Sequence, residues 1–256
     1  LESDLRHALQ DELLELHYQP HFDCVSGRLT GAEALLRWNH PQRGAISPAV
    51  FVPIAEEIGL IAALGDWVMD RACCQMASWQ KAGSPLPRLS INLSARQFTE
   101  GSLALQVGDV LRRHGLTPGS IELELTESVL LQDVDETMQT LKALKKLGVA
   151  IAVDDFGTGY SSLNYLKDFP IDTLKIDRSF IQAMHEDSRD TLLAQAIVAM
   201  GRSLQLRVIA EGVETAEQLA FLQQQECHTS QGYYFSRPVS EAAFCKLLDS
   251  MPTTGG

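Results

Sequence analysis

Val149-Ala150-Ile151-Ala152-Val153-Asp154-Asp155-Phe156-Gly157-Thr158-Gly159-Tyr160-Ser161-Ser162 is the stretch that decides the fold class. Its five leading apolar residues, three of them β-branched, predict a fully buried strand over 149–153. The strand delivers two adjacent carboxylates, and a loop with two glycines follows, which is typical of the mouth of a barrel or an open α/β sheet. Folding alone gives no reason to place two repelling aspartates side by side. A divalent cation would explain them, whereas the plainer interpretation is that they cap the next helix.

The length and composition indicate an ordinary globular chain. Its 256 residues, 45% hydrophobic and 21% charged, suit one large α/β domain or two small ones. Because no internal repeat or linker divides the sequence, we predict a single domain over residues 1–250 and a disordered tail over 251–256. The chain begins at Leu1 within a helical pattern, so we expect the domain to be cut from a longer protein.

The net charge of −12 argues against a nucleic-acid surface, because such surfaces work by releasing counterions from phosphates. An anionic ligand stays possible if metal ions supply positive charge. Five cysteines without a CxxC pair indicate reduced, cytosolic usage. The most apolar segment, 54–79, is interrupted by five charged residues and does not suit a membrane span. We therefore expect a cytoplasmic domain that contacts neither DNA nor the membrane.

Hydrophobic periodicity predicts helices and strands in alternation. Strands are expected at 16–22, 29–38, 89–93, 121–125, 149–153, 173–176, 207–209 and 228–235. Helices are expected at 1–14, at 48–58, after a break over 59–65 as far as Lys81, and at 96–114, 134–147, 161–166, 189–204 and 216–225, with Ser240 capping a last helix. This order predicts a (β/α)8 barrel. Turn residues at 23–27 join the first two strands as a hairpin, so one strand should run antiparallel in a modified TIM-type barrel.

In such a barrel the carboxyl ends of the strands face one mouth. Oxygen donors fall at those ends without any Cys or His among them: Glu33, Asn92, Glu124, Asp154, Asp155 and Glu211. Hard oxygen donors select Mg²⁺ or Mn²⁺, and two such ions about 3.5–4 Å apart form the clamp used on phosphodiester bonds. Lys175 would orient the attacking water or stabilise charge, and the glutamates after Ile209, Glu211 and Glu214, would include a general base.

Each of these residues also has a plainer interpretation. Glu33 could end a solvated strand, Asn92 could cap the following helix, Lys175 could pair with Asp177 or another carboxylate, and Glu214 could be an ordinary first-turn glutamate. Glu122, on the same strand face as Glu124, is read as structural. His17, His21 and His40 are read as surface or core-edge residues. The functional interpretation is preferred because polar residues recur at the ends of otherwise apolar strands.

An ordered series of motifs over about 16–238 resembles the EAL domain family, the bacterial phosphodiesterases of cyclic di-GMP. It comprises Tyr18-Gln19-Pro20, Glu33-Ala34-Leu35, Asn92-Leu93-Ser94, Glu124-Leu125-Thr126-Glu127, Asp154-Asp155-Phe156-Gly157, Leu174-Lys175-Ile176-Asp177, Ala210-Glu211-Gly212-Val213-Glu214 and Gln231-Gly232-Tyr233. The resemblance implies a barrel with one antiparallel strand and hydrolysis of cyclic di-GMP to linear 5′-pGpG with two Mg²⁺ or Mn²⁺ ions.

The resemblance also assigns roles to residues. The ligands of a first metal ion look like Glu33, Asn92, Glu124 and Asp154, and those of a second ion look like Asp154 and Asp155. Glu211 looks like a metal ligand or the general base. Lys175 looks like the residue that positions the water. Gln19, Leu36, Arg37, Glu214, Gln231 and Pro238 look like substrate contacts. Glu127 resembles the glutamate that holds the loop after Asp155, and that loop with its helix tends to form a homodimer interface. A sensor or GGDEF-type domain is expected upstream, and His21 is read as a local surface change.

Two other functions stay open at this point. A receptor module would bind cyclic di-GMP without cleaving it, which the intact carboxylate set argues against. A barrel lyase or aldolase would form a Schiff base on Lys175, but nearby carboxylates favour the charged ammonium over the nucleophilic amine.

Overall fold

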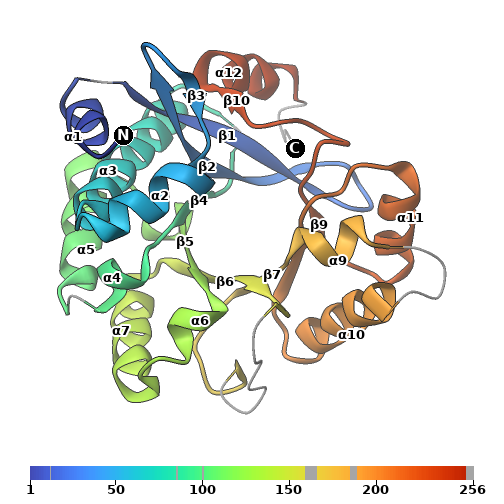
Figure 1. Ribbon diagram of the computed structural model, residues 1–256. Coiled ribbons are helices and arrows are strands. Elements are labelled where there is room, and N and C mark those ends of the chain that lie inside the picture. The colour runs from blue at the N-terminus through green and yellow to red at the C-terminus, as the bar shows by residue number, and fades with distance from the viewer. Residues whose placement is uncertain (12, 85, 100, 159–165, 185–188, 252–256) are drawn as a thin grey trace.

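Eight strands close into a ring in the computed structural model, which describes residues 1–11, 13–84, 86–99, 101–158, 166–184 and 189–251 (Figure 1). In order around the ring they are β1 (Leu14–Asp23), β9 (Thr229–Ser230), β8 (Arg207–Ala210), β7 (Thr173–Ile176), β6 (Ala150–Phe156), β5 (Ile121–Thr126), β4 (Leu89–Asn92) and β2 (Leu29–His40). Pairing of β2 with β1 closes the ring. The short strands β3 (Gly44–Ile46) and β10 (Val239–Ser240) add antiparallel to β2 and β1.

Strand β1 runs antiparallel to both of its neighbours in the ring, β2 and β9, whereas the other neighbouring strands are parallel. The reversal follows from the hairpin between β1 and β2. There Asp23 Oδ1 accepts hydrogen bonds from the backbone N–H groups of Val25 and Ser26, and Gly27 adopts a φ of 66°. The predicted modified TIM-type barrel with one antiparallel strand is therefore confirmed.

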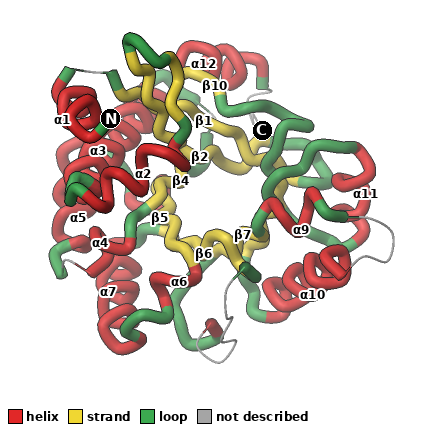
Figure 2. Tube along the Cα trace, viewed as in Figure 1, coloured by secondary structure: helices red, strands yellow, loops and turns green. Residues whose placement is uncertain are grey.

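Helices surround the ring of strands (Figure 2). The described ones are α1 (Glu2–Gln10), α2 (Pro48–Glu57), α3 (Ile61–Lys81), α4 (Ala95–Thr99), α5 (Leu103–His114), α6 (Glu127–Leu130), α7 (Val134–Leu147), α9 (Arg178–Gln182), α10 (Arg189–Ser203), α11 (Ala216–Gln224) and α12 (Glu241–Ser250), with a 3-10 turn at Pro118–Ser120. Across the described ranges, none of them is long and apolar enough to cross a membrane.

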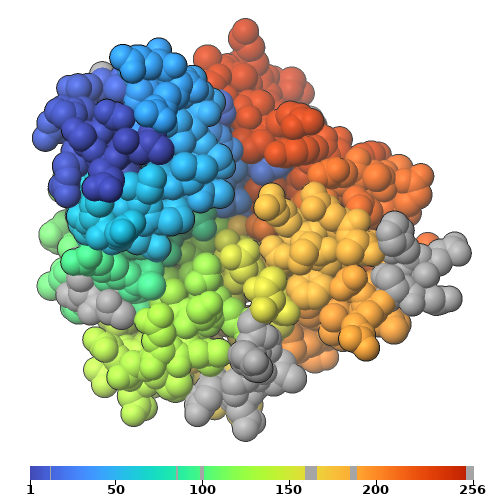
Figure 3. Space-filling view, viewed as in Figure 1, coloured from blue at the N-terminus to red at the C-terminus, as the bar shows by residue number. Residues whose placement is uncertain are grey.

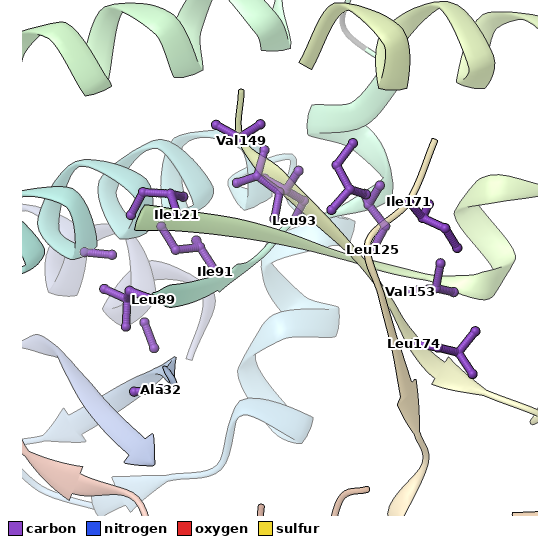
Figure 4. Close-up of a cluster of buried hydrophobic side chains, with 14 of the residues drawn as sticks. Ala32, Leu89, Ile91, Leu93, Ile121, Leu125, Val149, Val153, Ile171 and Leu174 are labelled. Carbon is purple, nitrogen blue, oxygen red and sulfur yellow. The ribbon is translucent and has the colours of Figure 1, made fainter. Parts of the chain in front are cut away.

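The main core lies between the outer face of the barrel and the helices. Along β5, Ile121, Leu123 and Leu125 belong to this core and are fully buried. Figure 4 shows part of the cluster, in which apolar side chains of β4, β5 and β6 lie together. Because side chains alternate along a strand, Glu122 and Glu124 point into the barrel. The same alternation that builds the core therefore carries charge to the interior.

A second, smaller core fixes the helices beside β2. Leu5 of α1, Phe51 of α2 and Leu64 of α3 pack in one cluster with Trp38, whose ring meets that of Phe51 edge-on at 5.7 Å. Helix α2 starts after Ser47, whose hydroxyl accepts from the N–H of Ala49, as predicted from the Ser-Pro pair. This cluster holds α2 at the rim of the barrel.

Several predicted boundaries are wrong. Helix α3 already starts at Ile61, so Gly65 lies inside the helix and not in a break before it. The residue at 65 is glycine because the Gln97 side chain occupies the space that a β-carbon would take. The predicted helix 96–114 is two helices, interrupted near Gly101 with its φ of 66°. Strand β6 continues beyond the predicted end through both aspartates, and β9 is only two residues long. Helix α9 was not predicted. Ser240 precedes the last helix but makes no side-chain capping hydrogen bond.

Two further predictions concern parts of the chain outside the described residues. The expected short helix at 161–166 falls there except for Leu166, which is helical. The expected disordered tail falls there except for Met251.

Candidate active site

The carboxyl ends of the parallel strands, together with the elements that follow them, enclose a pocket of about 560 Å³. We call this end of the barrel the mouth. Figure 3 shows this face in space-filling view, with the segment of α2 in cyan and that of α9 in orange on opposite sides. The lining residues are Gln19, Glu33, Leu35, Arg37, Pro48, Asp154, Asp155, Asp177, Arg178, Gln182, Glu211, Gly212, Glu214, Gln231, Gly232, Tyr233 and Pro238. The pocket gathers most of the predicted site residues, and Asn92, Glu124 and Lys175 are not part of its lining.

Lys175 is the charged centre beneath this pocket. Its Nζ lies 2.6 Å from Glu124 Oε2, 2.7 Å from Glu211 Oε1, 3.3 Å from Asp154 Oδ1 and 3.5 Å from Glu33 Oε2, and its side chain is completely buried. Burial alone would lower the pKa of Lys175, but the surrounding carboxylates together raise that pKa well above its ordinary value. Lys175 is therefore a permanent ammonium ion, which disfavours the Schiff-base alternative.

Amide side chains hold Glu33 in place from both sides. Asn92 Nδ2 donates to Glu33 Oε1 at 2.7 Å, and Gln231 Nε2 donates to Glu33 Oε2 at 2.8 Å and to Gln19 Oε1 at 2.9 Å. Gln19 in turn donates to the carbonyl of Ser236. Burial opposes ionisation of Glu33, but Lys175 and these amide donors lower the pKa of Glu33 below its usual value. Glu33 is thus a fixed, ionised carboxylate.

A β-bulge turns Asp154 and Asp155 toward the same pocket. The pairing of β6 with β7 shifts register between Val153 and Phe156, and Asp155 has a φ of 53°, which is uncommon for a residue other than glycine. In a regular strand, neighbouring side chains would point to opposite faces. Partial desolvation first, and then the charges of Asp154 and Asp177, raise the pKa of Asp155 to about 6. The bulge therefore concentrates negative charge at a cost in backbone and electrostatic energy.

The donor set fits divalent cations by its chemistry. Among the described side chains, Glu124 Oε1 is a buried oxygen without a hydrogen-bond donor, and buried Asp154 Oδ1 makes no hydrogen bond but forms an ion pair with Lys175 Nζ at 3.3 Å. Burial, followed by repulsion from Asp154 and Glu33, raises the pKa of Glu211 to about 8 against the opposing effect of Lys175. Within the described ranges no three acidic or imidazole groups converge on a single metal-sized point, because these oxygens converge on Lys175 Nζ instead. Cation binding would give Glu124 Oε1 a partner, would add positive charge beside Asp154, and would lower the raised pKa values.

Glu127 contacts the loop that follows the aspartates. Its Oε2 accepts a hydrogen bond from the backbone N–H of Gly157 at 3.2 Å. Gly157 has a φ of 96°, and a β-carbon there would lie 2.9 Å from the Phe180 ring. Both facts require glycine at this position. The rest of the loop, 159–165, lies outside the described residues.

The alternation of side chains along β2 corrects the prediction that Leu36 lines the substrate pocket. Leu35 lines the pocket, together with Glu33 and Arg37 on the same strand face. The side chain of Leu36 is half-buried against the two apolar cores, and its backbone carbonyl accepts a hydrogen bond from Arg37 Nη1 at 2.8 Å. Leu36 therefore supports Arg37, and Leu35 is the apolar residue of the pocket wall.

His21 corrects another prediction. It is only 2% exposed, pairs with Gly31 in β1–β2, and points into the barrel, so it is not a surface residue. Burial first, and Lys175 next, lower the pKa of His21 to about 4, which keeps the imidazole neutral. The strand alternation of β1, which puts Gln19 and His21 on one face, could have indicated this position.

Glu122 has the structural role expected of it. Its carboxylate accepts from Arg207 Nη2 at 2.6 Å, from Thr173 Oγ1 at 2.7 Å and from Ser90 Oγ at 3.0 Å. These contacts lie one strand layer below Glu124, toward the amino ends of the strands. Sequence reasoning missed Arg178, Gln182 and Tyr233 as pocket residues, because nothing in their local pattern distinguishes them from ordinary surface positions.

The fold and the site together define a modified TIM barrel whose acidic mouth surrounds a buried lysine. The chain belongs to the EAL domain family, since the family model described as EAL domain matches residues 2–238.

Two proteins of Pseudomonas aeruginosa are similar to it. The bifunctional diguanylate cyclase/cyclic di-GMP phosphodiesterase MucR is 48% identical over 92% of this chain and 34% of its own length. The cyclic di-GMP phosphodiesterase NbdA is 46% identical over 97% of this chain and 32% of its own length. The chain thus spans about a third of these relatives.

A solved structure shares the whole fold. The MucR phosphodiesterase in complex with cyclic di-GMP superposes with a TM-score of 0.92 at 47% identity, covering 94% of this chain and 98% of that one.

Proposed function

We propose that this chain hydrolyses cyclic di-GMP to linear 5′-pGpG in a reaction that depends on Mg²⁺ or Mn²⁺. The observation that carries the proposal is the set of Glu33, Glu124, Asp154 and Glu211 around the buried Lys175, at the mouth of an EAL barrel. The names of MucR and NbdA, and the MucR phosphodiesterase structure with cyclic di-GMP, support the choice of substrate.

The metal ligands follow from the donors in the mouth. Glu33, Asn92, Glu124 and Asp154 would hold one ion, Asp154 and Asp155 a second, and Glu211 completes the set. When bound, the ions would supply positive charge against the phosphoryl oxygens and make water a better nucleophile at neutral pH. These carboxylates outnumber the cations around them, which supports a requirement for added positive charge.

Glu211 accepts the proton of the attacking water in this proposal, and Lys175 positions that water. Glu211 holds its proton more tightly than an ordinary glutamate, because burial and neighbouring acids raise its pKa. A carboxylate of raised pKa at the pocket wall suits a general base that takes the proton of the attacking water. Lys175 keeps Glu211 and Glu124 at hydrogen-bond distance, so it aligns the base and the water site. The 3′ oxygen of the substrate then leaves.

The wall of the pocket supplies the substrate contacts. Gln19, Arg37, Glu214, Gln231 and Pro238 all line it. Gln182 Nε2 donates to Glu214 Oε1 at 2.9 Å, which holds that carboxylate at the rim. A pocket of about 560 Å³ is within the usual range for small-molecule sites.

Regulation is proposed through two connections. Gly157, just after Asp155, is tied to Glu127, and we infer that the chain segment after Asp155 takes part in a homodimer interface that is coupled to the metal ligands. The relatives are about three times as long as this chain, which supports a sensor or GGDEF-type domain elsewhere in the full protein.

Product analysis tests the proposed function. The chain is incubated with cyclic di-GMP and Mg²⁺ or Mn²⁺, with and without a chelator, and the nucleotides are separated by chromatography. We expect pGpG that accumulates only with free metal. Retention of intact cyclic di-GMP by the protein without any pGpG would contradict hydrolysis and favour a receptor module.

A further inference from the structure

The pocket wall carries two cationic side chains among its described residues, Arg37 and Arg178. The two arginines differ in the hydrogen bonds that they already make within the protein. Arg37 Nη1 donates to the Leu36 carbonyl, and the residue is half-buried. The Arg178 side chain is exposed and makes no hydrogen bond or ion pair with any part of the chain that the structure describes. Within the described residues, the guanidinium N–H donors of Arg178 are therefore unused and available to a ligand.

The two arginines stand on opposite sides of the mouth. Strand β2, which carries Arg37, is four strands away from β7 in either direction around the closed ring, through β4, β5 and β6 or through β1, β9 and β8. Arg178 follows β7 directly, as the first residue of α9. The two cations therefore lie at separate positions in the pocket wall.

The backbone fixes Arg178 at its place. Gly212, with a φ of 71°, passes so close that a β-carbon there would lie 2.6 Å from the β-carbon of Arg178. Asp177 caps α9 by accepting from the N–H of Ser179 at 3.0 Å. One turn later, Gln182 lies on the same face of α9 and also lines the pocket. Helix α9 therefore presents Arg178 to the pocket on a rigid base beside the loop that carries Glu211.

A cyclic dinucleotide carries a second phosphodiester group, which is the kind of anion that the Arg178 guanidinium binds. Such a ligand has two phosphodiester groups, and only one of them can lie over the carboxylate cluster at the floor. The other phosphate enters a pocket lined by Asp155, Asp177 and Glu214, where an unpaired anion is unfavourable. A guanidinium with free donors matches a phosphate in two parallel hydrogen bonds.

We propose that Arg178 binds the phosphate that is not cleaved, and so makes the pocket selective for substrates with two phosphodiester groups. This inference rests on the proposed hydrolysis of cyclic di-GMP. It makes Arg178 a specificity residue that contacts the substrate away from the reacting phosphorus.

Kinetics on two substrates test it. Arg178→Ala should raise KM for cyclic di-GMP roughly 10- to 100-fold, the effect of losing a charge-assisted hydrogen-bond pair, with little change in kcat. On bis(p-nitrophenyl) phosphate, which has a single phosphodiester, the same variant should match the wild type. Arg178→Lys should recover part of the loss. Arg43→Ala, which removes an exposed arginine outside the pocket, is the charge-matched control and should leave both substrates unaffected.

Equilibrium dialysis of cyclic di-GMP in the presence of chelator gives a second readout, in which Arg178→Ala should weaken binding by a similar factor. An unchanged KM and unchanged binding would overturn the inference. An equal loss on the single phosphodiester would also overturn it, since Arg178 would then act on the cleaved group. If the wild type hydrolyses neither substrate, the proposed function itself fails.

Discussion

Lys175 Nζ lies 2.6 Å from Glu124 Oε2 at the centre of the barrel, and neither side chain is exposed to solvent. Burial of both charges is unfavourable by itself, and breaking such a pair from one side leaves the other charge uncompensated. Here the uncompensated charges would include Glu211, Asp154 and Glu33 as well. We therefore expect Lys175 to be needed for the folded mouth as well as for the proposed reaction.

The first prediction concerns this ammonium. Lys175→Met should lower the free energy of unfolding by roughly 3–5 kcal/mol in the presence of chelator and remove activity. Urea denaturation followed by circular dichroism measures the loss. Arg113→Ala, which breaks the exposed pair with Asp70, is the control and should cost less than about 1 kcal/mol. Equal effects of the two substitutions would contradict a central role for Lys175.

The second prediction concerns pH. Asp155, with its pKa raised to about 6, and Glu211, with its pKa raised to about 8, bind protons more tightly in the folded chain than in the unfolded one. Their effect on stability is therefore most favourable below about pH 4 and is lost as the pH rises through 6 and 8. In chelator, Asp155→Asn should flatten the fall of Tm between about pH 4 and 6.

Added Mn²⁺ supplies the complementary measurement. A bound cation favours the charged carboxylates, so it should raise Tm most at the upper end of this pH range. A Tm profile that is identical with chelator and with Mn²⁺ would argue against metal binding at these residues.

The third prediction concerns the aspartate pair. Asp155→Ala should reduce turnover of cyclic di-GMP roughly 10³-fold at saturating Mg²⁺ while leaving a folded protein, because the second ion loses its own ligand. Asp249→Ala, at an exposed position of α12, is the matched control and should keep wild-type turnover. Near-normal turnover of Asp155→Ala would rule out the two-metal mechanism.

The fourth prediction concerns the loop held by Glu127. Gly157→Ala should destabilise the fold and lower activity, because the added methyl meets Phe180 at 2.9 Å in addition to the strain of a positive φ. Gly83→Ala has a comparable φ of 76° and open space around it, so its cost should be only about 1 kcal/mol. Comparison of Tm and kcat for the two variants separates the effect of the steric contact with Phe180 from the cost of placing alanine at a positive φ.

Strand alternation predicted much of the site from the sequence. It placed Glu33, Glu124, Lys175 and Glu211 at one end of the barrel because the strands that carry them are short, apolar and regular. Asp154 and Asp155 were also predicted at this end of the barrel, but the bulge that brings both into the pocket was not, since a bulge leaves no periodic pattern. Leu36 was named as a substrate contact from the family resemblance, whereas Leu35 is the residue that lines the wall.

Other features depended on contacts that the sequence does not display. Helix α9 is only five residues long, too short for a hydrophobic period, so neither it nor Arg178 was predicted. His21 was read as a local surface change, because the family commonly has an apolar residue after its Gln-Pro pair. The alternation of β1 could have indicated its interior position, which the pairing of β1 with β2 and β9 shows.

The most direct test of the central claim is hydrolysis of cyclic di-GMP in water enriched in heavy oxygen, with Mg²⁺ present, followed by mass spectrometry. Attack of water with departure of the 3′ oxygen predicts pGpG that carries a single labelled oxygen in its terminal 5′ phosphate. Unlabelled product, label at another position, or no cleavage by the metal-loaded chain would contradict the account.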